Sequence, residues 1–138
     1  MMEHFKDLSN EIQSLLAKNF SSDNNKFVVE VGSNDGVMLE HLVKANVSCL
    51  GIEPSKNVAE ISHQYGVPTV NKFMSVETAD QVISEYQQAN VIYSANVFCH
   101  IPDKIFSCFG GRRTKSCTSL FVRRSKKGKV CSRKIEAD

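Results

Sequence analysis

Two carboxylates flanking a glycine-containing turn are the residues of this chain whose types and spacing could bind a small molecule. Glu30 lies within the apolar run 27–31, and Glu53 follows a second apolar run, 23 residues later. A carboxylate inside a buried strand is costly unless it pairs with a cation or accepts hydrogen bonds. A carboxylate at the end of the next strand can accept from both hydroxyls of a ribose. The two acids together predict a nucleotide-type site.

The turn between the two acids has the sequence Gly32-Ser33-Asn34-Asp35-Gly36. Gly32 allows the backbone to turn sharply and to approach a ligand closely. Asn34 can take the left-handed conformation in place of a glycine. The helix that follows would present its first N–H groups to the ligand. The turn lacks the G-x-G-x-x-G pattern typical of dinucleotide-binding proteins.

A third candidate segment, 93–102, follows another apolar run and reads Y-S-A-N-V-F-C-H-I-P. It should lie at the same sheet edge as the glycine turn, because ligands of open α/β sheets bind at the carboxyl ends of the strands. Asn96 could line the site there. His100 is compatible with either a structural or a catalytic role.

Hydrophobic periodicity predicts alternating helices and strands before residue 104. Apolar residues at helical spacing predict a helix over 2–18. Strands are predicted at 27–31, 47–52 and 89–95, with a short third strand starting at 67–68. The helices between them are predicted at 37–45, 56–65 and from 75 or 78 to about 88. Ser55 is a candidate N-cap, and Gly66 a candidate C-cap. Such alternation is typical of an α/β fold with parallel strands and right-handed crossovers.

The charge distribution divides the chain near residue 103. Residues 1–103 hold 6 Lys and Arg against 13 Asp and Glu, and residues 104–138 hold 11 against 2. In the second part only residues 119–122 could form a strand. We therefore expect a folded domain over 1–103 and an irregular, poorly ordered basic tail over 104–138.

Composition excludes several other classes of protein. Five cysteines without a C-x-x-C pair argue against a disulfide framework or a metal site and favour free thiols in the cytoplasm. No apolar run is long enough for a transmembrane helix, and residues 1–18 carry too many charges for a signal peptide.

Several motifs in the first three quarters of the chain together resemble a family, the S-adenosylmethionine (SAM)-dependent C-methyltransferases that act on nucleotide-linked deoxy-ketosugars. The matching segments are M-x-E-H-F-K (1–6), F-V-V-E-V-G-S-N-D-G (27–36), L-G-I-E-P-S-x-N-V-A (50–59), G-V-P-T (66–69) and A-N-V-F-C-H-I-P-D (95–103). The resemblance implies a Rossmann-like class I methyltransferase fold. Four parallel strands in the order 3-2-1-4 would form an incomplete sheet flanked by helices.

The resemblance also implies a role for each candidate residue. Glu30, Gly32, Ser33, Asn34 and Gly36 would contact the methionine part of SAM. Glu53 and Pro54 would hold the ribose and adenine, Phe73 and Met74 would lie near the adenine, and Asn96 near the sulfonium. His100 would lie on the substrate side. The family reaction removes a proton beside a sugar ketone, which requires a positioned base.

The chain departs from this family in ways that leave its activity open. It lacks the family's N-terminal zinc-binding domain with paired cysteines, the later Y-x-E-H segment and the sugar-binding domain. We therefore expect weak SAM binding and poor turnover. The fourth strand should form an exposed edge that invites self-association. One alternative is a vestigial fragment that binds SAM without catalysis.

The basic tail has two explanations. One hypothesis is a frameshift. If the codons that could encode residues 105–119 are read one nucleotide later, they permit the sequence F-S-V-A-L-E-G-V-E-Q-S-L-A-P. This sequence resembles the family's next helix and turn. The other is a basic arm that binds nucleic acid or an anionic membrane. The tail has few aromatic residues and no amphipathic period. We therefore favour a small-molecule substrate over nucleic acid or membrane.

Overall fold

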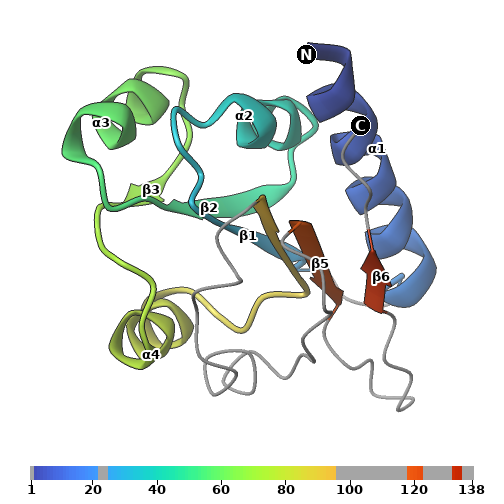
Figure 1. Cartoon of the computed structure of the whole chain (residues 1–138). Helices are drawn as coiled ribbons and strands as arrows, with labels where there is room; N and C mark the ends of the chain where they lie inside the picture. Colours follow the sequence, from blue (N-terminus) through green and yellow to red (C-terminus); the bar gives the residue numbers. More distant parts are fainter. Residues whose placement is uncertain (1, 22–24, 96–117, 123–131, 135–138) are drawn as a thin grey trace.

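The computed structural model describes residues 2–21, 25–95, 118–122 and 132–134. Within them four helices and six strands follow one another along the chain (Figure 1). They are α1 (Met2–Asn19), β1 (Phe27–Val31), α2 (Val37–Lys44), β2 (Ser48–Ile52), α3 (Lys56–Gln64), β3 (Thr69–Val70), α4 (Val76–Glu85), β4 (Val91–Ala95), β5 (Thr118–Val122) and β6 (Ser132–Lys134). The predicted α/β alternation is confirmed, and most predicted boundaries agree to within one or two residues.

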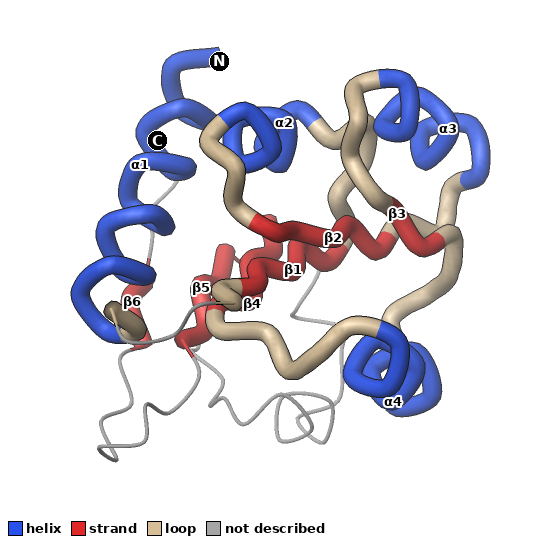
Figure 2. The backbone as a smooth tube through the Cα atoms, turned by 180° about the vertical axis from the view of Figure 1, so that it is seen from behind, coloured by secondary structure: helices blue, strands red, loops and turns tan. Residues whose placement is uncertain are grey.

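The strands form one sheet in the order β3-β2-β1-β4-β5-β6. The first four are parallel and follow the predicted order 3-2-1-4. In this register Glu30 of β1 lies between Gly51 of β2 and Tyr93 of β4. The three helices α1, α2 and α3 lie on one side of the sheet and α4 on the other (Figure 2). The carboxyl ends of β1, β2 and β4 therefore meet at one edge.

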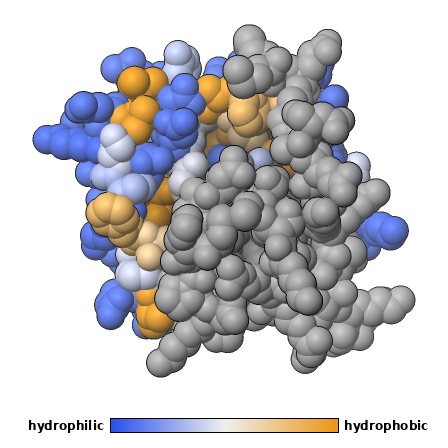
Figure 3. Space-filling model, viewed as in Figure 1, coloured by the Kyte–Doolittle hydropathy of each residue, from blue (hydrophilic) through white to orange (hydrophobic). Residues whose placement is uncertain are grey.

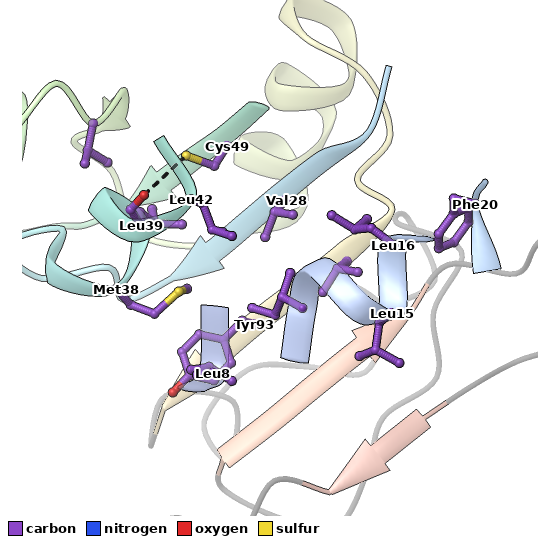
Figure 4. Close-up of a cluster of buried hydrophobic side chains, with 13 residues drawn as sticks. Leu8, Leu15, Leu16, Phe20, Val28, Met38, Leu39, Leu42, Cys49 and Tyr93 are labelled. Atoms are coloured by element: carbon purple, nitrogen blue, oxygen red, sulfur yellow. Dashed lines mark hydrogen bonds between the residues drawn. The ribbon is translucent and has the colours of Figure 1, made fainter. Parts of the chain in front are cut away.

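The sheet is buried on both faces because alternate side chains of its strands enter two separate cores. On one face, Val28 and Tyr93 pack with Leu8 of α1 and Met38 of α2 (Figure 4). On the other face, apolar residues of β1, β2 and β4 pack against Ala79 and Val82 of α4. This double burial explains why the strands read as continuous apolar runs rather than alternating ones.

One expectation about the sheet is wrong. We expected β4 to be an exposed edge, but β5 pairs with β4 antiparallel over its whole length, and β6 pairs with β5. The run 118–122, which includes the one tail segment predicted as a possible strand, takes up the hydrogen-bonding groups that β4 would otherwise expose. Self-association through β4 has therefore lost its basis. The proposed boundary at residue 103 lies outside the described residues and stays a prediction.

None of the helices in the described part of the chain is both long and apolar enough to cross a membrane.

Candidate cofactor site

The loop between β1 and α2 forms a tight turn that is hydrogen-bonded to the end of β2. Gly32, Asn34 and Gly36 all have positive φ angles, of 71°, 57° and 80°. The Gly32 N–H donates to the Ile52 carbonyl at 2.8 Å, and the Gly36 N–H donates to the Ser33 carbonyl at 3.0 Å. The left-handed conformation expected of Asn34 is confirmed. Glycine and asparagine are the residues that tolerate this left-handed backbone.

Glu53 joins this loop to the start of α3 through both of its carboxylate oxygens. Oε1 accepts from the Asn34 N–H at 3.0 Å, and Oε2 accepts from the Ser55 N–H at 2.8 Å. The residue is buried, with 8% of its surface exposed. Ser55 is the N-cap residue of α3, as predicted, but its own side chain makes no capping bond. Each oxygen of Glu53 retains a second lone pair for another donor.

Glu30 is a buried acid with an oxygen that has no visible partner. Its Oε2 is inaccessible and finds no hydrogen bond among the residues that the structure describes. Burial, and then the nearby charges of Asp35 and Glu53, raise the pKa of Glu30 well above the usual value for a glutamate. An acid in this position favours the protonated form until a cation compensates for the lost solvation.

Two serine hydroxyls at the carboxyl edge are also buried without a partner in the described part of the chain. They belong to Ser33 in the loop and to Ser94 near the end of β4. Ser94 pairs with Val31, so its side chain lies on the α4 face of the sheet and not on the face of Glu30. Ser33 occupies space that Gly51 leaves open, because a Cβ at position 51 would lie 2.7 Å from the Ser33 Cβ. Since buried polar groups are nearly always hydrogen-bonded, the unpaired oxygens of Glu30 and Ser33 are candidates for contact with a polar ligand.

The loop between β3 and α4 lies beside the β2 carboxyl end. The Asn71 Nδ2 donates to the carbonyl oxygens of Glu53 and Pro54, at 2.9 and 3.0 Å. Phe73 is 77% exposed, whereas Met74 is half-buried against the α4-side core. Apolar side chains reach the surface between α3 and α4 in the view of Figure 3. An exposed phenylalanine on a hydrogen-bonded loop is available to a flat, apolar ligand surface.

The structure thus brings most of the predicted cofactor residues to one sheet edge. They are Glu30, Gly32, Ser33, Asn34, Gly36, Glu53, Pro54, Phe73 and Met74. Asn96 and His100 lie outside the described residues, so their predicted roles stay predictions. Sequence reasoning missed Gly51, Ser94 and Asn71. A glycine inside an apolar strand is a signal of close approach and could have revealed Gly51.

A hollow of about 540 Å³ lies at the opposite, amino edge of the sheet. Its lining includes Phe27, Ser48 and Pro68, at or just before the starts of β1, β2 and β3, together with Tyr86 and Gln87. None of the predicted cofactor residues lines it. The candidate site therefore rests on the buried polar atoms at the carboxyl edge and not on the volume of a hollow.

Comparison with known proteins agrees with this geometry. Residues 2–106 match the profile of the methyltransferase domain family. The chain belongs to this family. The predicted Rossmann-like class I fold is confirmed, and so is SAM as the cofactor that such a methyltransferase domain uses.

Among curated relatives, the methyltransferase domain is 33% identical over 76 residues to the C-methyltransferase NovU of Streptomyces niveus, covering 55% of this chain and 18% of NovU. It is 24% identical over 96 residues to a ubiquinone biosynthesis O-methyltransferase of Hydrogenovibrio crunogenus, covering 68% of this chain and 40% of that protein. The chain thus spans less than half the length of these relatives.

Similar solved structures include a SAM-dependent methyltransferase from Archaeoglobus fulgidus, at 14% identity and a TM-score of 0.47, covering 72% of this chain and 44% of that one. DesVI of Streptomyces venezuelae aligns at 12% identity and a TM-score of 0.45, covering 86% of this chain and 64% of that one.

Proposed function

We propose that the carboxyl edge of the sheet binds SAM and forms the cofactor half of a C-methyltransferase site. The buried Oε2 of Glu30, which has no hydrogen-bond partner among the described residues, carries this proposal. The methionine part of SAM has an ammonium group, which is the cation that would pair with this oxygen and favour its ionised form. When bound, SAM supplies an electrophilic methyl group on a sulfonium.

The remaining contacts follow the shape of the loops. Gly32, Ser33, Asn34 and Gly36 would surround the methionine part, where the Ser33 hydroxyl also lacks a partner in the described part of the chain. The free lone pairs of Glu53 would accept from the ribose hydroxyls. This assignment fits because the two backbone donors already on Glu53 hold its carboxylate in one orientation.

The adenine would lie between the exposed turn at Pro54 and the β3–α4 loop. Phe73 offers an exposed ring there, and Met74 supports the loop from the core side. An aromatic ring can stack on a purine at little entropic cost when its loop is already ordered.

For the transfer itself, we propose a substrate with a carbon acid beside a ketone, as on a nucleotide-linked sugar. A base would take the proton from that carbon, and the resulting enolate carbon would bond to the methyl group as the bond from methyl to sulfur breaks. His100 is our candidate for the substrate side and Asn96 for the sulfonium side. The similarity to a C-methyltransferase supports the reaction class. We also propose a cytoplasmic location, which the five cysteines without a C-x-x-C pair support.

Isothermal titration calorimetry tests the cofactor claim. We expect the full chain to bind SAM and S-adenosylhomocysteine, and we expect Glu30→Gln to weaken both. Glu40→Gln is a matched control, because Glu40 pairs with Lys44 on the surface of α2 at 3.0 Å. Absence of heat with either ligand would overturn the proposal.

A second assay separates an active methyltransferase from a non-catalytic SAM-binding fragment. The chain is incubated with SAM and a nucleotide-linked ketosugar, and S-adenosylhomocysteine is quantified. Production above the level without sugar supports the enzyme, and binding without production supports the fragment. Salt-sensitive binding to random DNA in place of SAM binding would support the alternative that residues 104–138 are a basic arm for nucleic acid.

A further inference from the structure

Asn71, the first residue after β3, makes side-chain hydrogen bonds that no motif in the sequence predicts. Its side-chain amide donates to two consecutive backbone carbonyls, those of Glu53 at 2.9 Å and Pro54 at 3.0 Å. These carbonyls belong to the loop between β2 and α3. One side chain therefore joins two loops that lie about 17 residues apart in the sequence.

This amide belongs to a continuous set of hydrogen bonds. The Glu53 backbone is held by Asn71 and by its own N–H, which donates to the Val70 carbonyl at 3.0 Å. The Glu53 carboxylate then accepts from the Asn34 and Ser55 N–H groups. The orientation of the proposed ribose acceptor thus depends on the backbone that Asn71 holds.

The same loop also presents the proposed adenine contact. Phe73 follows Asn71 by two residues, and its carbonyl accepts from the Thr78 hydroxyl at 2.8 Å. The Ser75 side chain accepts from the Thr78 N–H at 3.1 Å and begins α4. Asn71 is therefore the link between an anchored loop bearing Phe73 and the turn bearing Glu53.

We propose that Asn71 is a positioning residue for the adenosine half of the cofactor, setting the Glu53 and Pro54 turn relative to Phe73. This inference rests on the proposed SAM-binding function. It requires the donor character of the amide, since both partners are carbonyl oxygens. A carboxylate of the same shape has no donor to offer them and would repel them.

The test uses two ligands and two variants. S-adenosylhomocysteine carries an adenosine thioether and an amino acid group, and 5′-methylthioadenosine carries the adenosine thioether without the amino acid group. In calorimetry on the full chain, Asn71→Ala should weaken both ligands by the same factor, about three- to tenfold for two partly exposed hydrogen bonds. Asn71→Asp should weaken both at least as much, although its shape is conserved. Glu30→Gln should weaken S-adenosylhomocysteine and leave 5′-methylthioadenosine unchanged.

Gln81→Ala is the matched control for this loop. Gln81 accepts from the Lys72 ammonium, so this variant removes a hydrogen bond of the residue next to Asn71 without touching Glu53 or Pro54. Its affinity for both ligands should equal that of the wild type. Thermal unfolding of each unliganded variant, followed by circular dichroism, shows whether a loss of affinity reflects unfolding. If an Asn71 variant is unfolded, Asn71→Ser, which keeps one small donor, replaces it.

The outcomes separate the two claims. If the wild-type chain binds neither ligand, the proposed function fails. If the wild type binds and the Asn71 variants bind equally well, the role of Asn71 is overturned and the proposed function stands. Wild-type affinity in Asn71→Asp, or a loss confined to S-adenosylhomocysteine, also overturns it, because either result would show that the amide donor does not serve the adenosine half.

Discussion

The two edges of the sheet treat their buried polar groups in opposite ways. At the amino edge, the Phe27 N–H donates to the Asn90 side chain at 2.9 Å, and the Asn90 N–H donates back to the Phe27 carbonyl at 2.8 Å. At the carboxyl edge, oxygens of Glu30, Ser33 and Ser94 are buried with no partner in the described part of the chain. Among the described residues, the buried pair at the amino edge is satisfied within the protein, whereas the buried oxygens at the carboxyl edge are left for the proposed ligand.

The difference between the two edges indicates the position of the cofactor site better than the size of a surface hollow does. The hollow of about 540 Å³ lies at the amino edge. The rings of Phe27 and Tyr86 stack on each other there, with centroids 5.8 Å apart. In cofactor sites a small number of precisely placed polar groups fix the orientation of the ligand. The comparison predicts that substitutions at the carboxyl edge alter ligand binding, whereas those at the amino edge alter stability alone.

The largest expected effect is on the free energy of unfolding and is seen by comparing alanine substitutions at two glycines with similar backbone conformations. Gly36 and Gly66 have φ angles of 80° and 76°. A Cβ at position 36 would lie 2.7 Å from the Ser62 Cβ, whereas one at position 66 would meet nothing within 4 Å. Gly36→Ala should lower the free energy of unfolding by about 2–4 kcal/mol, from strain and overpacking. Gly66→Ala should lower it by about 1 kcal/mol, from strain alone. Urea denaturation of both variants measures the difference, and equal losses would contradict the close packing of the cofactor loop.

Glu30→Gln should change binding and stability in opposite directions. Loss of a charge-assisted bond to the cofactor should lower the affinity for S-adenosylhomocysteine about 10- to 100-fold. The free protein should become more stable at neutral pH, because the variant removes a buried acid whose desolvation, together with Asp35 and Glu53, raises its pKa.

The raised pKa of Glu30 also predicts how the stability of the chain depends on pH. The folded chain keeps the Glu30 proton over a range in which the unfolded chain has lost it. The unfolded state therefore binds fewer protons there, and the stability that Glu30 contributes falls as the pH rises from the ordinary glutamate value through the raised pKa. Urea denaturation from pH 4 to 8 should show a shallower fall for Glu30→Gln than for the wild type. Parallel curves would refute this assignment.

Asn90→Ala at the amino edge should affect stability only. It leaves the buried Phe27 N–H without its side-chain acceptor and should lower the free energy of unfolding by about 1–2 kcal/mol. Gln87→Ala is the control, because Gln87 donates to the Asn25 carbonyl at an exposed position. Affinity for S-adenosylhomocysteine should stay at the wild-type value in both variants, and a loss in Asn90→Ala would mean that the two edges are coupled.

Tyr86→Ala should give the smallest effect. It removes the ring that stacks on Phe27 and should lower stability by about 1 kcal/mol. Tyr86→Phe keeps the ring and should restore most of that loss. If the alanine variant also changed ligand affinity, the amino-edge hollow would have to be reconsidered as a functional site.

Much of the fold was predictable because its elements are encoded locally. The apolar runs that form β1, β2 and β4 are bounded by glycine, proline and polar residues, and Ser75 acts as a capping residue with its partner three residues later. The third strand was predicted to start at 67–68, one or two residues before its observed start at Thr69. It has only two residues, too few to set a period, and its pairing with Gly51 and Ile52 decides where it lies.

The pairing of β5 with β4 could not be predicted from periodicity. The run 118–122 has the composition of a strand, but nothing local specifies its partner or its direction. In the fold, one edge of β4 pairs with β1, and β5 pairs antiparallel with the backbone groups of the other edge.

For the site, the sequence by itself determined the types of residue at the carboxyl edge: an acid in the first strand, a turn of residues that tolerate positive φ, and an acid after the second strand. Their chemistry and spacing carry that information along the chain. Only the tertiary structure decided that Glu53 holds the loop, that Gly51 makes room for Ser33, and that Asn71 joins two loops. These contacts connect residues from different strands, and their distances exist only once the parallel sheet has brought the carboxyl ends together.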